Sequence, residues 1–444
     1  MQVNLSNRQI LKIAGPICLA LILPQINHMT NAAFLGHLGE FPFAVNAIAG
    51  IYYLVMYMIA HGLNNGLQVL FARRAGELNY AGMGRYFSNG LMLALLFSAV
   101  AILLTYSLAP YFFAHSLHDV HIRDAATSFI RIRIWGLPFL MLMGLCNSFY
   151  TGTGNTRLLA ITSLFQEAVN ISLDYGLIFG KMGLPALGLN GAAYASIIAE
   201  FVGFLAAFSL LFGFKFPKKF HLFAWLKPDM TAIRNILSIS APLIIQFLFS
   251  IGSWLIFFIF IEHLGQRPLA ISNMMRSIFG LFGIFTWALA STCNTMVSNL
   301  IGQGRENEVI KTVKKISGFA FLCAMVVSLL INIFPYQLLH IYTPDTAMIT
   351  EALPSIHVCT LVTLLSSVTA IVFNGVTGTG NTRINLFIEF AAVTVYLIYC
   401  FVVIERWQSP LHWAWGAEFV YWITMISLAL WYLRSGRWKG KTIA

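Results

Sequence analysis

Three polar residues recur at helical spacing within one long apolar stretch and could carry ion or proton chemistry. Glu167, Asn170 and Asp174 in QEAVNISLDYGLIFG stand at positions i, i+3 and i+7, which places them on one stripe of a helix. A carboxylate inside a membrane can accept a proton or serve as an Na+ ligand, and Asn170 adds a neutral oxygen. The alternative is a structural carboxylate that bonds to a neighbouring helix. We favour ion binding for Asp174, and both interpretations stay open for Glu167.

Two other apolar stretches carry residues that could contribute to the same site. Asn31 should lie at a depth similar to that of Asp174, so the two are partners if their helices touch, although a lone amide is more often a packing contact. Pro24 precedes Asn31 by two turns and should bend that helix, because proline removes a backbone hydrogen bond. The Ser196 hydroxyl could reach a site around Asp174.

Further titratable groups are candidate accessories to this site. Glu200 follows Ser196 by one turn of a helix, and His61 lies in the inner half of its own apolar stretch. His61 could titrate near neutral pH, but a hydrogen-bonded interior histidine is the simpler interpretation. Glu167, His61 and Glu200 are therefore predicted as accessory groups and Asp174 as the central one.

The composition predicts an all-α integral membrane protein. Of 444 residues, 58% are hydrophobic and 10% are charged, and the mean hydropathy is +0.77. Soluble domains carry about 25% charged residues. Apolar runs of about 20 residues recur along the chain and lack the alternation of barrel strands. No short apolar segment with a cleavage site precedes the first run, so no cleaved signal peptide is expected.

The chain contains an internal duplication. TGTGNTR occurs at residues 151–157 and again at 377–383, and we call the sequence separation of Thr151 from Thr377 the repeat offset. Pro16 and Pro242 keep the same offset, as do the HLG tripeptides at His37 and His263. Two nearly equal halves follow from this pattern. Each heptapeptide is rich in Gly, Asn and Thr, so it predicts a short polar loop between two helices.

Twelve membrane spans are predicted, six in each half. Because six is even, both halves enter the membrane from the same side, as parallel repeats related by an axis along the membrane normal. The predicted domains are 1–212, a basic cytoplasmic linker at 213–235, and 236–444 with a basic tail. The predicted spans are residues 10–36, 43–71, 87–111, 129–150, 158–180, 187–212, 236–261, 271–300, 316–340, 355–375, 384–404 and 412–433.

The positions of the charges indicate topology and argue against nucleic acid binding. The net charge is +11, and most of the 27 Lys and Arg fall in the tails and even-numbered connections, which predicts cytoplasmic N- and C-termini. The six cysteines lie in apolar runs without CxxC spacing, so neither a disulfide framework nor a zinc site is expected.

Enzyme motifs are missing from the sequence. HExxH and GxSxG are absent, and GKT at residues 440–442 has Ser435 where a phosphate-binding loop needs glycine. A membrane-embedded enzyme would also need catalytic groups clustered at one depth, and the acids and histidines are scattered. We therefore expect a non-enzymatic protein without a cofactor.

Several stretches, in their order and spacing, resemble the multidrug and toxic compound extrusion (MATE) transporters, in particular their DinF-like branch. The resemblance covers nearly the whole chain and is carried by TNAAFLGHLGE, FIRIRIWGLP, TGTGNTR, VNISLDYGLIFG and LNGAAYASIIAE. It implies twelve helices in two six-helix lobes forming a V, in the inner membrane. It also implies a monomeric secondary antiporter that exports amphipathic organic compounds in exchange for H+ or Na+.

The resemblance places the family's cation site on Asn31, Asn170 and Asp174, with Ser196 as a further match, and Na+ as one candidate ion at Asp174. Asn31 is a departure, because similar relatives usually carry aspartate there. The acids of the NorM-like branch in the second half are missing, with serines at Ser250 and Ser366.

The second half lacks a copy of the acidic stripe. The repeat offset puts Tyr396 opposite Asn170 and Cys400 opposite Asp174, so coupling chemistry is expected in the first half. Two alternatives remain open. A flippase for lipid-linked precursors would need several central cations, but the midplane offers mainly Arg276. A non-transporting sensor or scaffold is the other, since Asn31 would be compatible with lost transport.

Overall fold

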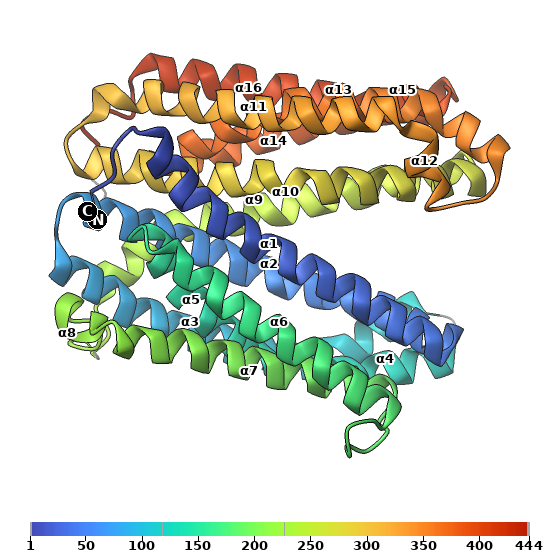
Figure 1. Ribbon diagram of the computed structural model, residues 1–444, viewed down its shortest axis with the longest axis horizontal. Coiled ribbons are helices and arrows are strands. Elements are labelled where there is room, and N and C mark those ends of the chain that lie inside the picture. The colour runs from blue at the N-terminus through green and yellow to red at the C-terminus, as the bar shows by residue number, and fades with distance from the viewer. Residues whose placement is uncertain (1, 118, 226, 442–444) are drawn as a thin grey trace. The chain divides into compact units, whose positions relative to one another are not determined.

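The computed structural model describes residues 2–117, 119–225 and 227–441, which form two compact units. The first unit comprises residues 15–244, and the second comprises residues 2–14 and 245–444. Within each unit the long helices run alongside one another (Figure 1). The unit boundaries fall inside two helices, next to Pro16 and close to Pro242, the pair of prolines that the duplication relates.

The first unit is built from most of α1, helices α2 to α8 and the beginning of α9. A 3-10 turn at Ile134–Gly136 joins α4 to α5, which together form one span. The helices are α1 (Asn7–Leu38), α2 (Glu40–Gly76), α3 (Tyr80–Ser116), α4 (Val120–Arg133), α5 (Leu137–Gly152), α6 (Thr156–Phe179), α7 (Leu189–Gly213) and α8 (Phe216–Phe220).

The second unit contains most of α9 and the helices that follow. A π-helical segment at Phe401–Arg406 continues α14. The helices are α9 (Met230–His263), α10 (Gln266–Gly302), α11 (Val309–Ile333), α12 (Pro335–His340), α13 (Thr346–Gly378), α14 (Thr382–Cys400), α15 (Leu411–Trp415) and α16 (Ala417–Ser435).

The all-helical membrane fold is confirmed. Eleven spans among the described residues are long and apolar enough to cross a membrane. The remaining predicted span, the fifth, is α6, which is less apolar than the others because Glu167, Asn170 and Asp174 lower its mean hydropathy. One predicted span is wrong at its end. Residues 316–340 do not form one continuous helix, because α11 ends at Ile333 and Pro335 disfavours helical geometry in the residue before it.

The two units repeat the same packing and the same turns. In the first unit α2 packs on α3 and α5, and α6 packs on α7; in the second, α10 packs on α11 and α13, and α14 packs on α16. Asp119 and Asp345, which the repeat offset relates, each cap a helix by accepting two backbone N–H bonds. Each TGTGNTR heptapeptide joins two helices, as predicted, and residues 153–155 and 379–381 form the loops between them. Gly154 and Gly380 have φ of 77° and 83°, which favour glycine.

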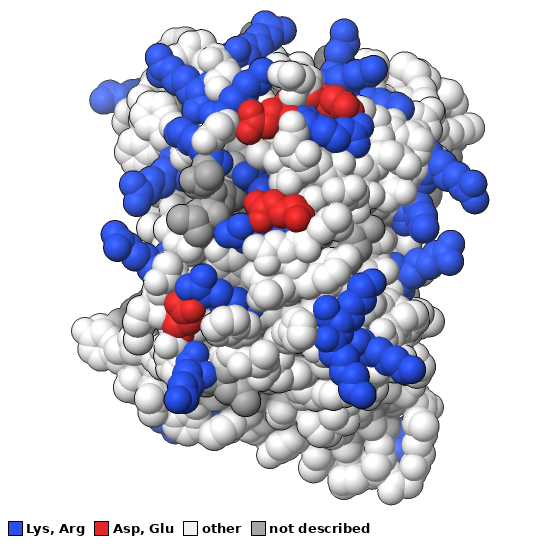
Figure 2. Space-filling model, turned by 90° about the vertical axis from the view of Figure 1, so that its left-hand side faces the viewer, with Lys and Arg blue, Asp and Glu red and all other residues white. Residues whose placement is uncertain are grey.

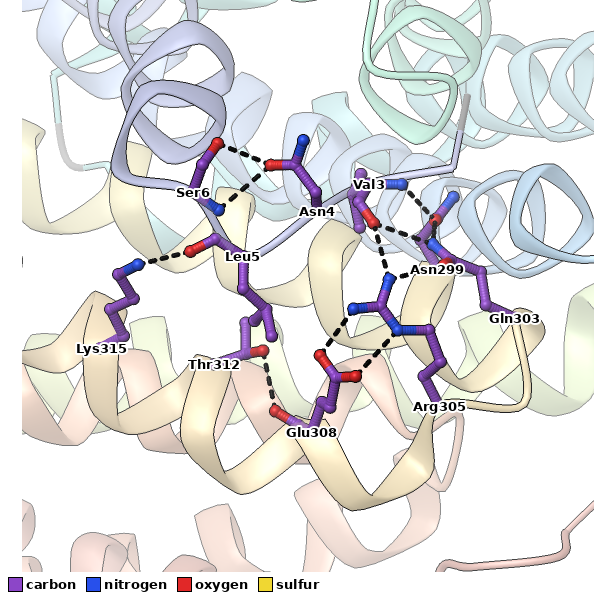
Figure 3. A network of polar contacts seen from close by, with 10 residues as sticks. All are labelled: Val3, Asn4, Leu5, Ser6, Asn299, Gln303, Arg305, Glu308, Thr312 and Lys315. Carbon is purple, nitrogen blue, oxygen red and sulfur yellow. Dashed lines mark hydrogen bonds and ion pairs between the residues drawn. The ribbon is translucent and has the colours of Figure 1, made fainter.

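The start of the chain is bound to the second unit by a polar network (Figure 3). The Val3 N–H donates to Asn299 Oδ1 over 3.0 Å, and the Val3 carbonyl accepts from Gln303 Nε2 over 3.1 Å. Arg305 donates a hydrogen bond to the same carbonyl over 3.4 Å. The Arg305 guanidinium group also donates two hydrogen bonds to the Glu308 carboxylate. Val3 is only 4% exposed, so this segment is docked rather than solvated.

Among the charged side chains on the face drawn in Figure 2, Lys and Arg prevail and Asp and Glu are few. The predicted basic linker, residues 213–235, contains the short α8 and the beginning of α9 at Met230. Asp229 precedes α9, accepts from two backbone N–H groups and pairs with Arg85 over 2.5 Å. This ion pair ties the linker to the beginning of α3.

Candidate functional site

Asp174 forms the centre of a polar group between α1 and α6. Its side chain is fully buried, with 0% exposure, and its Oδ2 accepts a hydrogen bond from Asn31 Nδ2 over 3.0 Å. This contact is the one expected from the similar depths of the two residues. Asp174 Oδ1 is buried and makes no hydrogen bond among the described residues.

Aromatic packing explains why these two helices meet here. Phe34, one turn after Asn31, packs against Tyr175 and Phe179 of α6, with ring centroids 6.1 Å and 5.6 Å apart. These contacts fix the rotation of α1 about its axis, so that the Asn31 amide faces Asp174.

The polar stripe continues along both helices. Asn170 Nδ2 lies 3.4 Å from Ser196 Oγ on α7, so Ser196 joins the group through Asn170. Asn27, one turn before Asn31, lies beside the Glu167 carboxyl group. The predicted residues Glu167, Asn170, Asp174, Asn31 and Ser196 are therefore brought together on three neighbouring helices.

Four oxygen atoms of this group have no hydrogen-bond donor among the residues that the structure describes. They are buried atoms of side chains on α1 and α6, namely Asn27 Oδ1, Glu167 Oε2, Asn170 Oδ1 and Asp174 Oδ1. A buried acceptor that lacks a donor costs about 1–3 kcal/mol. Such an arrangement suits a ligand that supplies positive charge, either a proton or a cation that prefers oxygen ligands.

Glu200 has a different environment from the other acids. Arg133, at the end of α4, binds it through two hydrogen bonds of 2.8 Å and 2.6 Å, and the Tyr53 hydroxyl donates over 3.1 Å. The guanidinium carbon lies 3.9 Å from the centroid of the Tyr53 ring. Glu200 is therefore one member of a buried ion pair, which argues against the predicted accessory role.

Arg133 and Tyr53 were not among the predicted site residues. Arg133 lies inside the predicted span 129–150, and an arginine within an apolar stretch was the signal that could have revealed it. Gly136 leaves room for the pair, since an added Cβ would lie 2.6 Å from Arg133 Nη1 and closer still to Glu200 Oε2. Arg133 also acts electrostatically on Glu167 and Asp174.

Two other predicted residues lie elsewhere on these helices. His61 is exposed on α2, and its ring lies 5.9 Å from that of Tyr57. Pro24 lies inside α1, which remains one helix from Asn7 to Leu38. The missing N–H of Pro24 leaves the Ala20 carbonyl without its usual partner, so α1 is weakened there.

A separate cavity in the first unit shares no residue with this site. Its volume is about 730 Å³. It is lined by Tyr106, Asp124, Thr127, Ser128, Arg131, Ile132, Trp135, Tyr194 and Ile197.

A protein-family model described as MatE matches the chain twice, over residues 16–176 and 242–402. The two matches are separated by the repeat offset that relates the duplicated motifs. The family model therefore confirms the internal duplication, and each match begins at one of the paired prolines.

Individual proteins are similar over almost the full length. A probable multidrug resistance protein NorM of Thermotoga maritima is 24% identical over 98% of this chain and 94% of its own. A structure described as the outward-facing conformation of a multidrug resistance MATE family transporter has a TM-score of 0.89 at 15% identity, covering 96% and 95% of the two chains. One described as MATE in complex with MaL6 has a TM-score of 0.87 at 16% identity, covering 98% and 97%.

Proposed function

The chain belongs to the MATE family of transporters and is not an enzyme, and we propose that it exports amphipathic organic compounds by antiport with H+ or Na+. The T. maritima relative is named for multidrug resistance, which supports organic compounds as substrates. Ser250 and Ser366, in place of the acids expected in NorM-like chains, support assignment to the DinF-like branch.

The observation that carries the ion-coupling proposal is the unpartnered oxygen of Asp174. Asn31 satisfies one carboxylate oxygen, and the other is buried without a donor among the described residues. A buried carboxylate oxygen without a donor favours a partner that supplies positive charge, so a bound proton or Na+ is the natural partner. Asn170 and Ser196 would complete the coordination with neutral oxygens.

Occupancy of this site can act on α1. The Asn31 amide links α1 to Asp174, so a change in the charge of the carboxyl group changes how strongly α1 is held. Pro24, about two turns away, weakens α1 because one backbone bond is missing. We propose that α1 bends at Pro24 as Asp174 alternates between occupied and free states.

The alternative functions have less support. A flippase for phosphate-bearing lipids needs unpaired central cations, but Glu200 already neutralises Arg133. Arg276 lies over the Phe258 ring at 5.2 Å. A sensor or scaffold would not need buried acceptors that lack donors. We further propose a monomer in the inner membrane, as the family resemblance implies, with both termini in the cytoplasm, as the basic connections indicate.

Transport in proteoliposomes tests this function. Efflux of a fluorescent cationic dye would be driven separately by a pH gradient and by an Na+ gradient. We expect one gradient to drive efflux and Asp174→Asn to abolish the response, which also identifies the coupling ion. Asp124→Asn is the matched control, because that carboxyl group has a side-chain exposure of 68%.

Gradient-driven efflux that persists unchanged in Asp174→Asn would overturn the coupling role. If neither gradient drives efflux of any of several cationic dyes, antiport itself would be rejected. Binding of a dye that responds to neither pH nor Na+ would then favour the scaffold.

A further inference from the structure

The second unit contains a polar cluster at the place that corresponds to the site around Asp174. The repeat offset relates Asn170 to Tyr396 and Asp174 to Cys400, both on α14, and Ser196 to Trp422 on α16. α14 packs on α16 as α6 packs on α7. The corresponding helices are thus in place, but the side chains differ.

A buried acid from α16 enters this cluster. Glu418 is 3% exposed, and its Oε2 accepts a hydrogen bond from Trp422 Nε1 over 3.0 Å. Its offset partner in the first unit is Ala192, so the acid has no counterpart there. Glu418 lies seven residues after the start of the span Leu411–Ser435, which is long and apolar enough to cross a membrane.

A tyrosine hydroxyl group faces this acid. Tyr396 is 2% exposed, and its Oη lies beside the Glu418 carboxyl group without a hydrogen bond of normal geometry. The Tyr396 ring packs against Phe257 and Tyr421, with centroids 6.0 Å and 5.8 Å apart. These contacts hold the hydroxyl beside Glu418, where it can accept a hydrogen bond from the protonated acid.

The other titratable groups that face Glu418 carry no positive charge. They are the thiols of Cys359 on α13 and Cys400 on α14, and the Tyr421 hydroxyl, which donates to Glu389 over 2.8 Å. No Lys or Arg of the described residues forms an ion pair with Glu418 or Glu389. In the first unit Arg133 supplies a positive charge, whereas the repeat offset places Cys359 at the corresponding position of the second unit.

Electrostatics then favours the neutral acid. An ionised carboxyl group buried in apolar surroundings without a cation pays a large desolvation penalty, whereas the protonated form does not. The start of α16 favours an anion, but that effect is smaller and is felt only in the first turn. The Trp422 N–H can donate to either form, so it does not reverse the preference.

We propose that Glu418 is a proton-binding site of the second unit, held as a neutral carboxylic acid between Trp422 and Tyr396. The proton on Glu418 has Tyr396 Oη as its acceptor, which gives that hydroxyl a partner. The π-helical segment that follows Cys400 supports a specialised site, since such segments are rare and frequent at functional positions. The site does not rest on the proposed antiport.

Infrared difference spectroscopy of the purified full-length protein tests the proposal without transport. The wild type at neutral pH should show the C=O stretching band of a protonated carboxyl group, and Glu418→Gln should remove one such band. Glu351→Gln is the control, because that carboxyl group has a side-chain exposure of 55% and should contribute no protonated band at neutral pH. The Asp174→Asn variant identifies any protonated-carboxyl band that comes from Asp174 in the first unit.

If the protonated band at neutral pH is the same in wild type and Glu418→Gln, the proposal is wrong. A second variant covers the case in which Glu418→Gln does not fold. Trp422→Phe keeps the acid and removes the donor to Oε2, so the band should move to higher frequency without losing intensity. A spectrum unchanged by Trp422→Phe would also overturn the proposal.

Discussion

The ion pair between Arg133 and Glu200 offers a sharp test of the electrostatics inside the first unit. Its members differ in one respect that decides the outcome. Glutamate can become neutral by binding a proton, whereas arginine stays charged at any ordinary pH. We therefore predict that Glu200→Leu destabilises the protein more than Arg133→Leu.

The geometry sets the expected magnitudes. The side chains of Arg133 and Glu200 are 15% and 3% exposed, and two short hydrogen bonds join them. Removing one partner of a buried pair costs about 3–5 kcal/mol, and the slight exposure of Arg133 favours about 3 kcal/mol for Glu200→Leu. This change corresponds to roughly a 100-fold shift in the unfolding equilibrium. Arg133→Leu should cost about 2 kcal/mol, since the Tyr53 hydroxyl still donates to Glu200.

The double variant, with Leu at both positions, completes the thermodynamic cycle. Because apolar replacement of a whole buried pair is often neutral, it should lie within about 1 kcal/mol of the wild type. Unfolding in SDS titrations can be followed with a thiol-reactive fluorogenic dye. Four cysteines are buried in the folded protein and become reactive when it unfolds, namely Cys146, Cys293, Cys359 and Cys400.

Additive losses in the double variant would refute the reasoning, since they would mean that the two side chains stabilise the protein independently. Equal losses of unfolding free energy in Glu200→Leu and Arg133→Leu would refute the predicted difference between the two variants. An unchanged Glu200→Leu variant would show that Arg133 reaches water by a small movement, so that its charge is not buried.

Two further predictions concern the connections outside the membrane. The Arg85 guanidinium lowers the pKa of Asp229 to about 2, so this pair should stabilise the protein fully above about pH 4 and lose its contribution as pH falls towards 2. Tryptophan-monitored unfolding should therefore show that the stability advantage of wild type over Asp229→Asn, which keeps the helix cap, disappears at low pH. Val3→Asp should lower the unfolding free energy by about 2 kcal/mol by burying a charge, whereas the exposed Asn4→Asp should not; equal effects would contradict docking of this segment.

Hydropathy and the repeated motifs were sufficient to predict the positions of the helices. They were insufficient for helix ends, because polar turns extend beyond the apolar stretch. The fourth predicted span began at residue 129, whereas α4 begins at Val120 with the polar turns of VHIRDAATS. An average over apolar residues cannot detect such turns. Pro335 did carry a signal, and it marks where the ninth predicted span ends early.

The candidate site could be predicted in part because depth and helical spacing are properties of sequence. They predicted a similar depth for Asn31 and Asp174, with Asn170 on the same stripe as Asp174, and the structure shows Asn31 and Asp174 in contact. Which acidic side chain pairs with an arginine depends on the rotation of each helix about its axis. Arg133 and Glu200 lie 67 residues apart on helices whose facing sides no single sequence reveals.

Asn31 limits the charge that the proposed site around Asp174 would exchange. An aspartate there would place a second titrating carboxyl group beside Asp174, and repulsion between the two would favour a shared proton. The Asn31 amide instead supplies a donor that never changes charge, and it leaves Asp174 with one open oxygen. One proton or one Na+ is sufficient to satisfy that oxygen. If the proposed antiport uses a further proton, that proton would bind elsewhere, at Glu167 within the same stripe or at Glu418 in the other half of the duplication.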